Sequence, residues 1–354
     1  MKICTRQICF IMLAYTVMSK ILIYPTALSS VCGRDLWFPA LLSFAVQALV
    51  VWAISFLCSR TDKTFFELIE GTLGNICARI IYGLFGLFFI LAAIMPISEQ
   101  KLYVHAIFYD TVPSLLVFLP FFAFSVYAAS KKLTNVGRAA DICLPIFILS
   151  LVFIFIMSLW EVKWDNLLPV LKTPVKKLFG GSLSTAYLFF EPCWLLMFMG
   201  HFKYKKWDAA KITASYVGGG LIVLFFLFVF YGIYGEISVM RQFAVSKISL
   251  FFPAIEMLGR IDLVALYILE IVMLFALVLN IQLAVHCLVK CTGWQNTPAL
   301  SCIVNGILLV LTIVLDNKYT AMNGVFGKWL WIVFLLFATI IPILSWTMKR
   351  RRAK

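Results

Sequence analysis

Charged residues are scarce in this chain, and their scarcity excludes most soluble folds. Only 13% of the 354 residues are charged, whereas 63% are hydrophobic and the mean hydropathy is +1.00. The apolar runs repeatedly reach the roughly 20 residues that a helix needs to cross a bilayer. They are continuous rather than alternating, so they do not fit the short strands of a β-barrel. The composition therefore predicts an all-α, polytopic membrane protein.

The residue groupings that enzymes and metalloproteins need are also missing. The ten cysteines form no C-x-x-C pair, and the three histidines fall at or near the ends of apolar runs, with no carboxylate at helical spacing. The sequence has no nucleophile–base arrangement and no phosphate-binding loop. Gly218, Gly219 and Gly220 lie inside an apolar run, where they are typical of close helix packing. We expect neither an enzyme nor a metal or cofactor site.

Ten transmembrane spans can be delimited along the chain, and we treat the whole of residues 1–354 as one transmembrane domain. They are Ile8 to Ser30, Trp37 to Cys58, Ala78 to Ile107, Val112 to Ala129, Ile142 to Trp160, Leu183 to Phe202, Ile212 to Tyr231, Leu263 to Val289, Pro298 to Leu315 and Val325 to Met348. An even number of spans places both termini on one side of the membrane.

The basic residues predict which side that is. The net charge is +14, but most Lys and Arg lie in short loops between spans, where they set topology, so no nucleic-acid partner is expected. The tail from Lys349 to Lys354 and most of the other basic residues fall on the side of the termini. Both termini are therefore predicted to be cytoplasmic. The outer connections 161–182 and 232–262 are too long for turns and predict short interfacial helices.

Two spans contain a break at a similar depth. The first span carries Ser19, Lys20 and Pro25 in mid-course, and the sixth carries Glu191 and Pro192. Proline removes a backbone donor and crowds the carbonyl four residues earlier, so each helix should open there. A matched pair of interrupted spans indicates a LeuT-like fold of two inverted repeats of five spans, here about 5–161 and 183–348, joined by the outer loop 162–182. Ordinary proline kinks are the alternative.

Such breaks have a specific chemical use. Half-helix N-termini attract an anion and half-helix C-termini present carbonyls to a cation, so together they suit an α-amino acid. The predicted ligand-binding residues are the backbone near Ser19, Lys20 and Ile21, then Glu191 with its aromatic neighbours, and finally a pair on span three. The aromatic neighbours are Phe190 and Trp194, and the span-three pair is Glu99 and Tyr103.

Lys20 needs a partner or a role, because a lysine at mid-membrane depth costs about 2.5 to 3.5 kcal/mol. We expect a buried ion pair with either Glu99 or Glu191. Alternatively, Lys20 occupies the place that a coupling cation fills in related folds. Lys101 and Glu270 lie nearer the outer ends of their helices, so we expect Lys101 to reach the interface by snorkelling and Glu270 to be interfacial or loop-paired.

Short motifs along the chain resemble those of the endospore germination permeases, the B subunits of GerA-type spore germinant receptors. They are the sequence from Lys20 to Pro25, the Gly33-Arg-Asp-Leu-Trp37 stretch, Glu191 in an aromatic sixth span, and Phe252-Pro-Ala254. The resemblance covers essentially the whole chain in length and span count. It implies membership of the amino acid, polyamine and organocation transporter superfamily, with an inverted-repeat fold.

The resemblance also implies a function and partners. This chain would bind an amino acid or a similar small nutrient in the spore inner membrane, together with an A subunit and a lipoprotein C subunit, and would signal germination. Two features depart from the family. Small residues are usual in the family where Met18 and Lys20 stand in this chain. The family pattern also matches only loosely around Tyr267 to Phe275, so the resemblance assigns no role to Glu270. The rival interpretation is a proton- or cation-coupled amino acid permease.

Overall fold

A computed structural model describes residues 3–59, 62–108, 111, 113–202, 204–205, 207–241, 244 and 261–315, with single positions at 333, 336 and 340. The described chain is helical, and its one extended pairing is an isolated bridge between Ile3 and Phe202. The longer helices are α1 (Thr5–Met18), α2 (Tyr24–Cys32), α3 (Trp37–Ser59), α4 (Phe65–Leu73), α5 (Asn75–Phe108), α6 (Ser114–Ala129), α7 (Thr134–Ser158), α8 (Val175–Ser184), α10 (Asp208–Tyr234), α12 (Ile261–Thr292) and α13 (Thr297–Val314).

Six of the described helices are long and apolar enough to cross a membrane. These six regions fall on α3, α5, α7, α10, α12 and α13, and those on α7 and α10 run on beyond the helix to Glu161 and Met240. Two shorter apolar helices, α1 and α6, come next in length. The expected first and sixth spans are each divided into shorter helices, and the expected tenth span, Val325 to Met348, lies outside the described residues. The chain is a multi-pass helical membrane protein, and ten spans stays a prediction.

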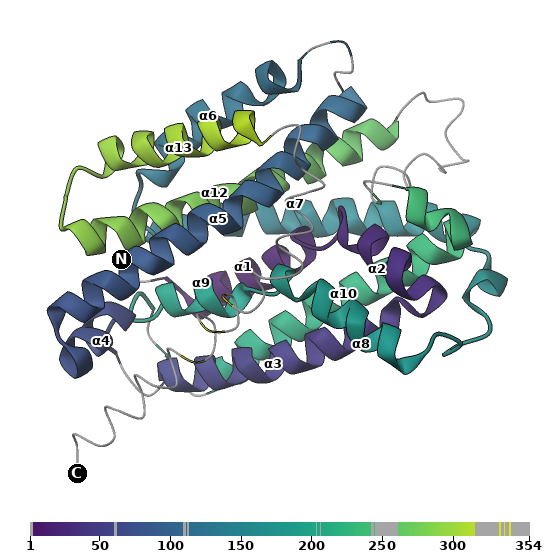
Figure 1. Cartoon of the computed structure of the whole chain (residues 1–354), viewed down its shortest axis with the longest axis horizontal. Helices are drawn as coiled ribbons and strands as arrows, with labels where there is room; N and C mark the ends of the chain where they lie inside the picture. Colours follow the sequence, from purple (N-terminus) through teal and green to yellow (C-terminus); the bar gives the residue numbers. More distant parts are fainter. Residues whose placement is uncertain are drawn as a thin grey trace.

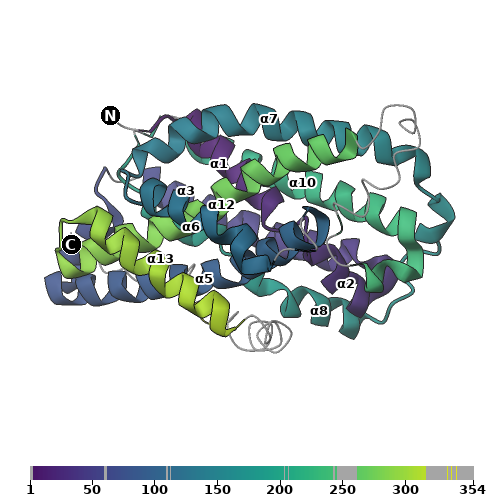
Figure 2. The same ribbon diagram turned by 90° about the horizontal axis from the view of Figure 1, so that it is seen from above.

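The helices form one elongated bundle whose long axis is horizontal in Figure 1. Helices α5 and α12 pack side by side along this axis, and α6 and α13 cover them on one flank (Figures 1 and 2). On the other flank α3 packs against α10. Helix α1 contacts α7, α10 and α12, so it runs through the middle of the bundle. The N-terminus and the α2–α8 pair lie at opposite ends of the bundle (Figure 2).

Helix α7 begins eight residues before the expected start at Ile142. Its first two turns are polar, so a hydropathy boundary misses them. They are stabilised by α1, because the carboxylate of Asp141 accepts hydrogen bonds from Arg6 at 3.0 Å and from Gln7 at 2.6 Å. The helix therefore extends beyond its apolar stretch.

The outer connection between α7 and α8 is built from short helices, as expected. It contains two 3-10 turns, η2 (Leu159–Glu161) and η3 (Trp164–Leu167), and leads into α8. The second long connection begins with the 3-10 helix η5 (Gly235–Met240), and most of its remainder lies outside the described residues. The fully buried carboxylate of Asp35 ties the first connection to the start of α3, because it accepts the backbone N–H of Leu171 at 2.7 Å and of Thr173 at 2.8 Å.

We expect Asp35→Asn to lower the free energy of unfolding by about 1 to 3 kcal/mol, because the buried amide keeps only one acceptor oxygen and leaves one of the two part-buried N–H groups without its partner. Thermal unfolding of the purified protein measures the loss, and limited proteolysis within residues 163–174 should become faster. The control is Asp165→Asn, since Asp165 is exposed in the same connection. Equal melting temperatures for the two variants would show that Asp35 does not anchor the connection.

Candidate functional site between two broken helices

The first broken helix opens over residues 19–23, between α1 and α2. Pro25 explains where it opens: it occupies the first turn of α2, where no backbone donor is required, and its ring excludes a continuous helix on its N-terminal side. The opening frees backbone groups for tertiary contacts. The carbonyl of Leu22, for example, accepts the N–H of Ala244 at 3.1 Å.

The second broken helix opens at Phe189 and Phe190. It consists of α8, the short 3-10 turn η4 (Ala186–Leu188), and α9 (Glu191–Met197), whose first turn contains Pro192. Gln47 of α3 donates a hydrogen bond to the freed carbonyl of Phe189 at 3.0 Å. The break beside Glu191 is the one that the sequence predicts, and it follows from the same proline chemistry as the first.

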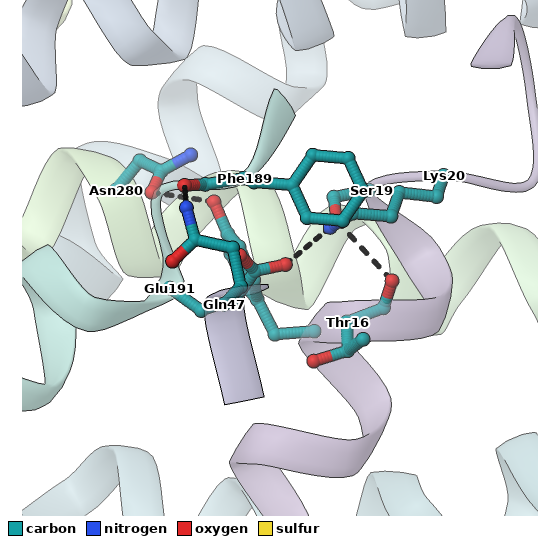
Figure 3. Close-up of polar contacts among 8 residues, drawn as sticks. Thr16, Ser19, Lys20, Gln47, Phe189, Glu191 and Asn280 are labelled. Carbon is teal, nitrogen blue, oxygen red and sulfur yellow. Dashed lines mark hydrogen bonds and ion pairs between the residues drawn. The ribbon is translucent and has the colours of Figure 1, made fainter. Parts of the chain in front are cut away.

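Lys20 and Glu191 form an ion pair where the two breaks meet (Figure 3). Both side chains are fully buried, at 0% exposure. The ammonium of Lys20 also donates to the hydroxyl of Ser19 at 3.0 Å and lies 4.5 Å from the centre of the Phe189 ring. Of the two partners that the sequence offered for Lys20, the structure selects Glu191. The pair is nearly dry, so its energy depends on both charges being present.

A small cavity adjoins the pair. Its volume is about 40 Å³, and its walls come from both breaks together with α5 and α12. It is lined by Tyr15, Met18, Ser19, Leu22, Pro96, Glu99, Gln100, Leu188, Phe190, Met273, Ala276, Leu277 and Asn280. Ordinary ligand pockets hold at least roughly 300 Å³, so this cavity has room for only a few water molecules. The helices are therefore closed around the site.

The predicted site residues separate into three groups. Ser19, Glu99 and Phe190 line the cavity, and Lys20 and Glu191 form the ion pair beside it. The remaining three, Ile21, Tyr103 and Trp194, are buried but do not line the cavity. The indole of Trp194 instead supports the ring of Tyr15, with 6.0 Å between ring centres.

Sequence reasoning missed the polar wall of the cavity on α12. The hydroxyl of Tyr15 donates to the side-chain carbonyl of Asn280 at 2.9 Å, and both groups are buried. Gln100, on α5, also lines the cavity. Asn280 and Gln282 stand in an otherwise apolar run, and polar amides at such a depth were the signal that could have revealed this wall.

Two expectations about residues near the outer ends of helices were wrong. Glu270 does not lie at the interface: it is buried on α12 and accepts a hydrogen bond from Gln100 of α5. Lys101 does not snorkel, because its side chain is only 1% exposed. The reason is that α5 and α12 pack along most of their length, so residues near their outer ends still face a neighbouring helix.

Among the residues that the structure describes, no group of three or more His, Cys, Asp and Glu side chains converges as metal ligands would. Several buried polar atoms at the junction have no hydrogen-bond partner within the described chain, among them the second carboxylate oxygen of Glu191, the indole N–H of Trp194 and the side-chain oxygen of Gln47. The junction thus contains hydrogen-bonding atoms that its ion pair does not use.

Comparison with known proteins assigns the chain to a family. The sequence model of a family described as spore germination protein matches residues 2–321, which is most of the chain. The chain belongs to this germination permease family. A curated relative, spore germination protein YndE of Bacillus subtilis (strain 168), is 23% identical over 240 residues, or 67% of this germination permease and 65% of the relative. The match therefore spans slightly less than two thirds of the relative's length.

Solved transporters share the fold of this germination permease. MhsT in complex with L-phenylalanine aligns with a TM-score of 0.63 at 12% identity, over 98% of this chain and 89% of that one. A nucleobase-cation-symport-1 family transporter in a closed conformation with bromovinylhydantoin bound gives 0.59 at 11% identity, over 94% and 78%. A mutant manganese transporter of Eremococcus coleocola gives 0.60 at 11% identity, over 96% and 78%. The germination permease thus has a transporter-like fold of the LeuT type.

Proposed function

We propose that this chain is the membrane subunit of a spore nutrient germinant receptor, and that it binds an amino acid or a similar small nutrient between its two broken helices. The observation that carries the proposal is the meeting of both breaks at the buried Lys20–Glu191 pair, with a cavity at its side. The family assignment supports a place in the spore inner membrane with an A subunit and a lipoprotein C subunit, and the distribution of basic residues supports cytoplasmic termini.

The ion pair suggests how a nutrient is sensed. An α-amino acid carries an ammonium and a carboxylate, so it can offer Glu191 and Lys20 a new partner each. Binding would then separate two side chains that otherwise hold α9 against the segment after α1. Because the cavity of about 40 Å³ is too small for an amino acid, the ligand must select a more open arrangement of these helices. That shift is the signal passed to the partner subunits.

The second candidate function is a proton- or cation-coupled amino acid permease, which is favoured by the transporter fold. A carrier must open the site alternately to both sides, whereas a sensor needs only a ligand-biased equilibrium. Uptake of radiolabelled amino acids into proteoliposomes distinguishes the two. The receptor proposal expects binding without flux, and saturable uptake by the isolated chain would overturn it.

Glu191→Gln leaves the buried Lys20 without its counter-charge, so we expect less receptor in the membrane; for the receptor that remains, the nutrient concentration that gives half-maximal germination should rise about ten- to a hundredfold, because the variant lacks the negative charge that meets the ligand ammonium. The measurement is a germination dose–response of spores that carry the variant, with membrane abundance followed by immunoblot. Asp208→Asn is the matched control, since Asp208 is equally buried but lies at the start of α10, where it accepts from Thr5 at 2.7 Å. Complete loss of the Glu191 variant from the membrane would instead assign Glu191 a structural role.

A further inference from the structure

Two hollows adjoin at the outer end of the bundle, opposite the N-terminus, and they share one residue, Arg34. The first hollow, of about 370 Å³, is walled by the end of α2, the start of α8 and η5, and includes Arg34, Lys172 and Lys177. The second, of about 430 Å³, is walled by Arg34 and by apolar residues: Trp37, Trp164, Leu167, Leu168, Val170 and Phe228. A basic hollow thus lies beside an apolar one, with Arg34 between them.

The basic hollow carries more positive than negative charge. Arg34 donates to the carbonyl of Leu168, and its guanidinium lies 3.9 Å from Glu236, whose side chain is 89% exposed. Lys172 and Lys177 form no ion pair with a residue that the structure describes. Asp35 lies nearby, but its two oxygens already accept backbone N–H groups. Three cations, Arg34, Lys172 and Lys177, therefore face two carboxylates, Glu236 and Asp35, and the single positive charge that remains attracts an anion.

The apolar hollow lies at the depth where membrane spans end. Trp37 is the first residue of α3, and its ring stacks on Phe228 of α10 at 6.1 Å. Trp164 and Val170, in the connection that follows α7, are 62% and 50% exposed. Tryptophan is enriched at membrane interfaces, where its ring sits at headgroup level. Exposed apolar side chains at this level are in contact with lipid rather than with bulk water.

We propose that these hollows bind an anionic phospholipid, with its phosphate between Arg34, Lys172 and Lys177 and an acyl chain along Trp37, Trp164 and Phe228. An amphipathic ligand matches the two hollows in both charge and polarity, whereas a small soluble anion leaves the apolar hollow uncovered. The lipid contacts the end of α2, the half-helix that follows the first break, and α8, the half-helix that precedes the second. A lipid bound at this site therefore makes the arrangement of the outer halves of both broken helices depend on the lipid composition of the membrane.

Native mass spectrometry of the detergent-purified full chain tests the proposal, with phosphatidylglycerol and phosphatidylcholine of the same acyl chains as probes. Phosphatidylglycerol should bind more tightly. Lys172→Gln/Lys177→Gln should weaken it by about 25-fold, because each basic residue near an anionic lipid contributes about a factor of five. The matched control is Lys163→Gln/Lys176→Gln, which removes the same charge from the same segments at positions that do not line either hollow.

Each further outcome bears on the proposal. Val170→Asn should weaken the binding of phosphatidylglycerol while leaving the melting temperature of the protein unchanged, because Val170 lines only the apolar hollow. Glycerol phosphate, which has the headgroup charge but no acyl chain, should bind at least tenfold more weakly than the lipid. Equal binding of both lipids, equal loss in the two double variants, or equal binding of glycerol phosphate would overturn the assignment.

Discussion

Lys20→Met is expected to destabilise the folded protein by about 3 to 5 kcal/mol, because it leaves Glu191 as an uncompensated charge at 0% exposure. The melting temperature of the purified protein should fall accordingly. Methionine is unbranched and only one atom shorter than lysine, so the loss reports mainly on charge rather than on a cavity. The double variant Lys20→Met/Glu191→Met is the complementary experiment. It removes both charges and should recover most of the lost stability.

One control makes this result specific. Lys211→Met removes a lysine whose side chain is 64% exposed and lies 3.9 Å from the buried carboxylate of Asp208; because solvent screens the lysine ammonium, this pair contributes at most about 1 kcal/mol. A Lys20→Met protein that melts like the unsubstituted chain would contradict the buried pair. If the single variant folds with unchanged stability but does not respond to nutrient, then Lys20 serves the site in place of a coupling cation.

Gly200→Ala is the second substitution with a large expected effect, about 2 to 5 kcal/mol of destabilisation. Gly200 has a φ of +78°, and a Cβ there would lie 2.8 Å from the backbone nitrogen of Thr64 and 2.9 Å from its Cα. The left-handed backbone alone costs an L-residue about 1 to 2 kcal/mol, and overpacking against rigid backbone adds about 1 to 3 kcal/mol. The chain leaving α9 could no longer pack against the start of α4.

Gly293→Ala is the control for this prediction. Gly293 has nearly the same φ, +73°, but a Cβ there would meet no atom within 4 Å. Its substitution should therefore show the backbone cost alone. Thermal unfolding of both variants in the same detergent isolates the packing contribution. Similar melting temperatures for Gly200→Ala and Gly293→Ala would show that the contact between Gly200 and Thr64 is not tight.

The breaks in the two helices were predictable because proline acts locally. Pro25 and Pro192 each lack a backbone donor, and each stands in the first turn of a half-helix, as the sequence indicates. Lys20 was recognisable for a similar reason, since a charge inside an apolar run needs no tertiary information to be conspicuous. The lining by Tyr15 and Asn280 was not predicted, because it depends on which faces of α1 and α12 meet.

The sequence by itself determined the membrane class, the positions of both breaks and the need for a partner to Lys20, because hydropathy and proline chemistry depend on neighbouring residues. Only the tertiary structure decided that the partner is Glu191 rather than Glu99, since 171 positions separate Lys20 from Glu191 and the choice depends on how distant helices are rotated and at what depth they pack. The same long-range packing buries Lys101 and Glu270, closes the cavity to about 40 Å³, and brings Arg34 to the junction of two hollows.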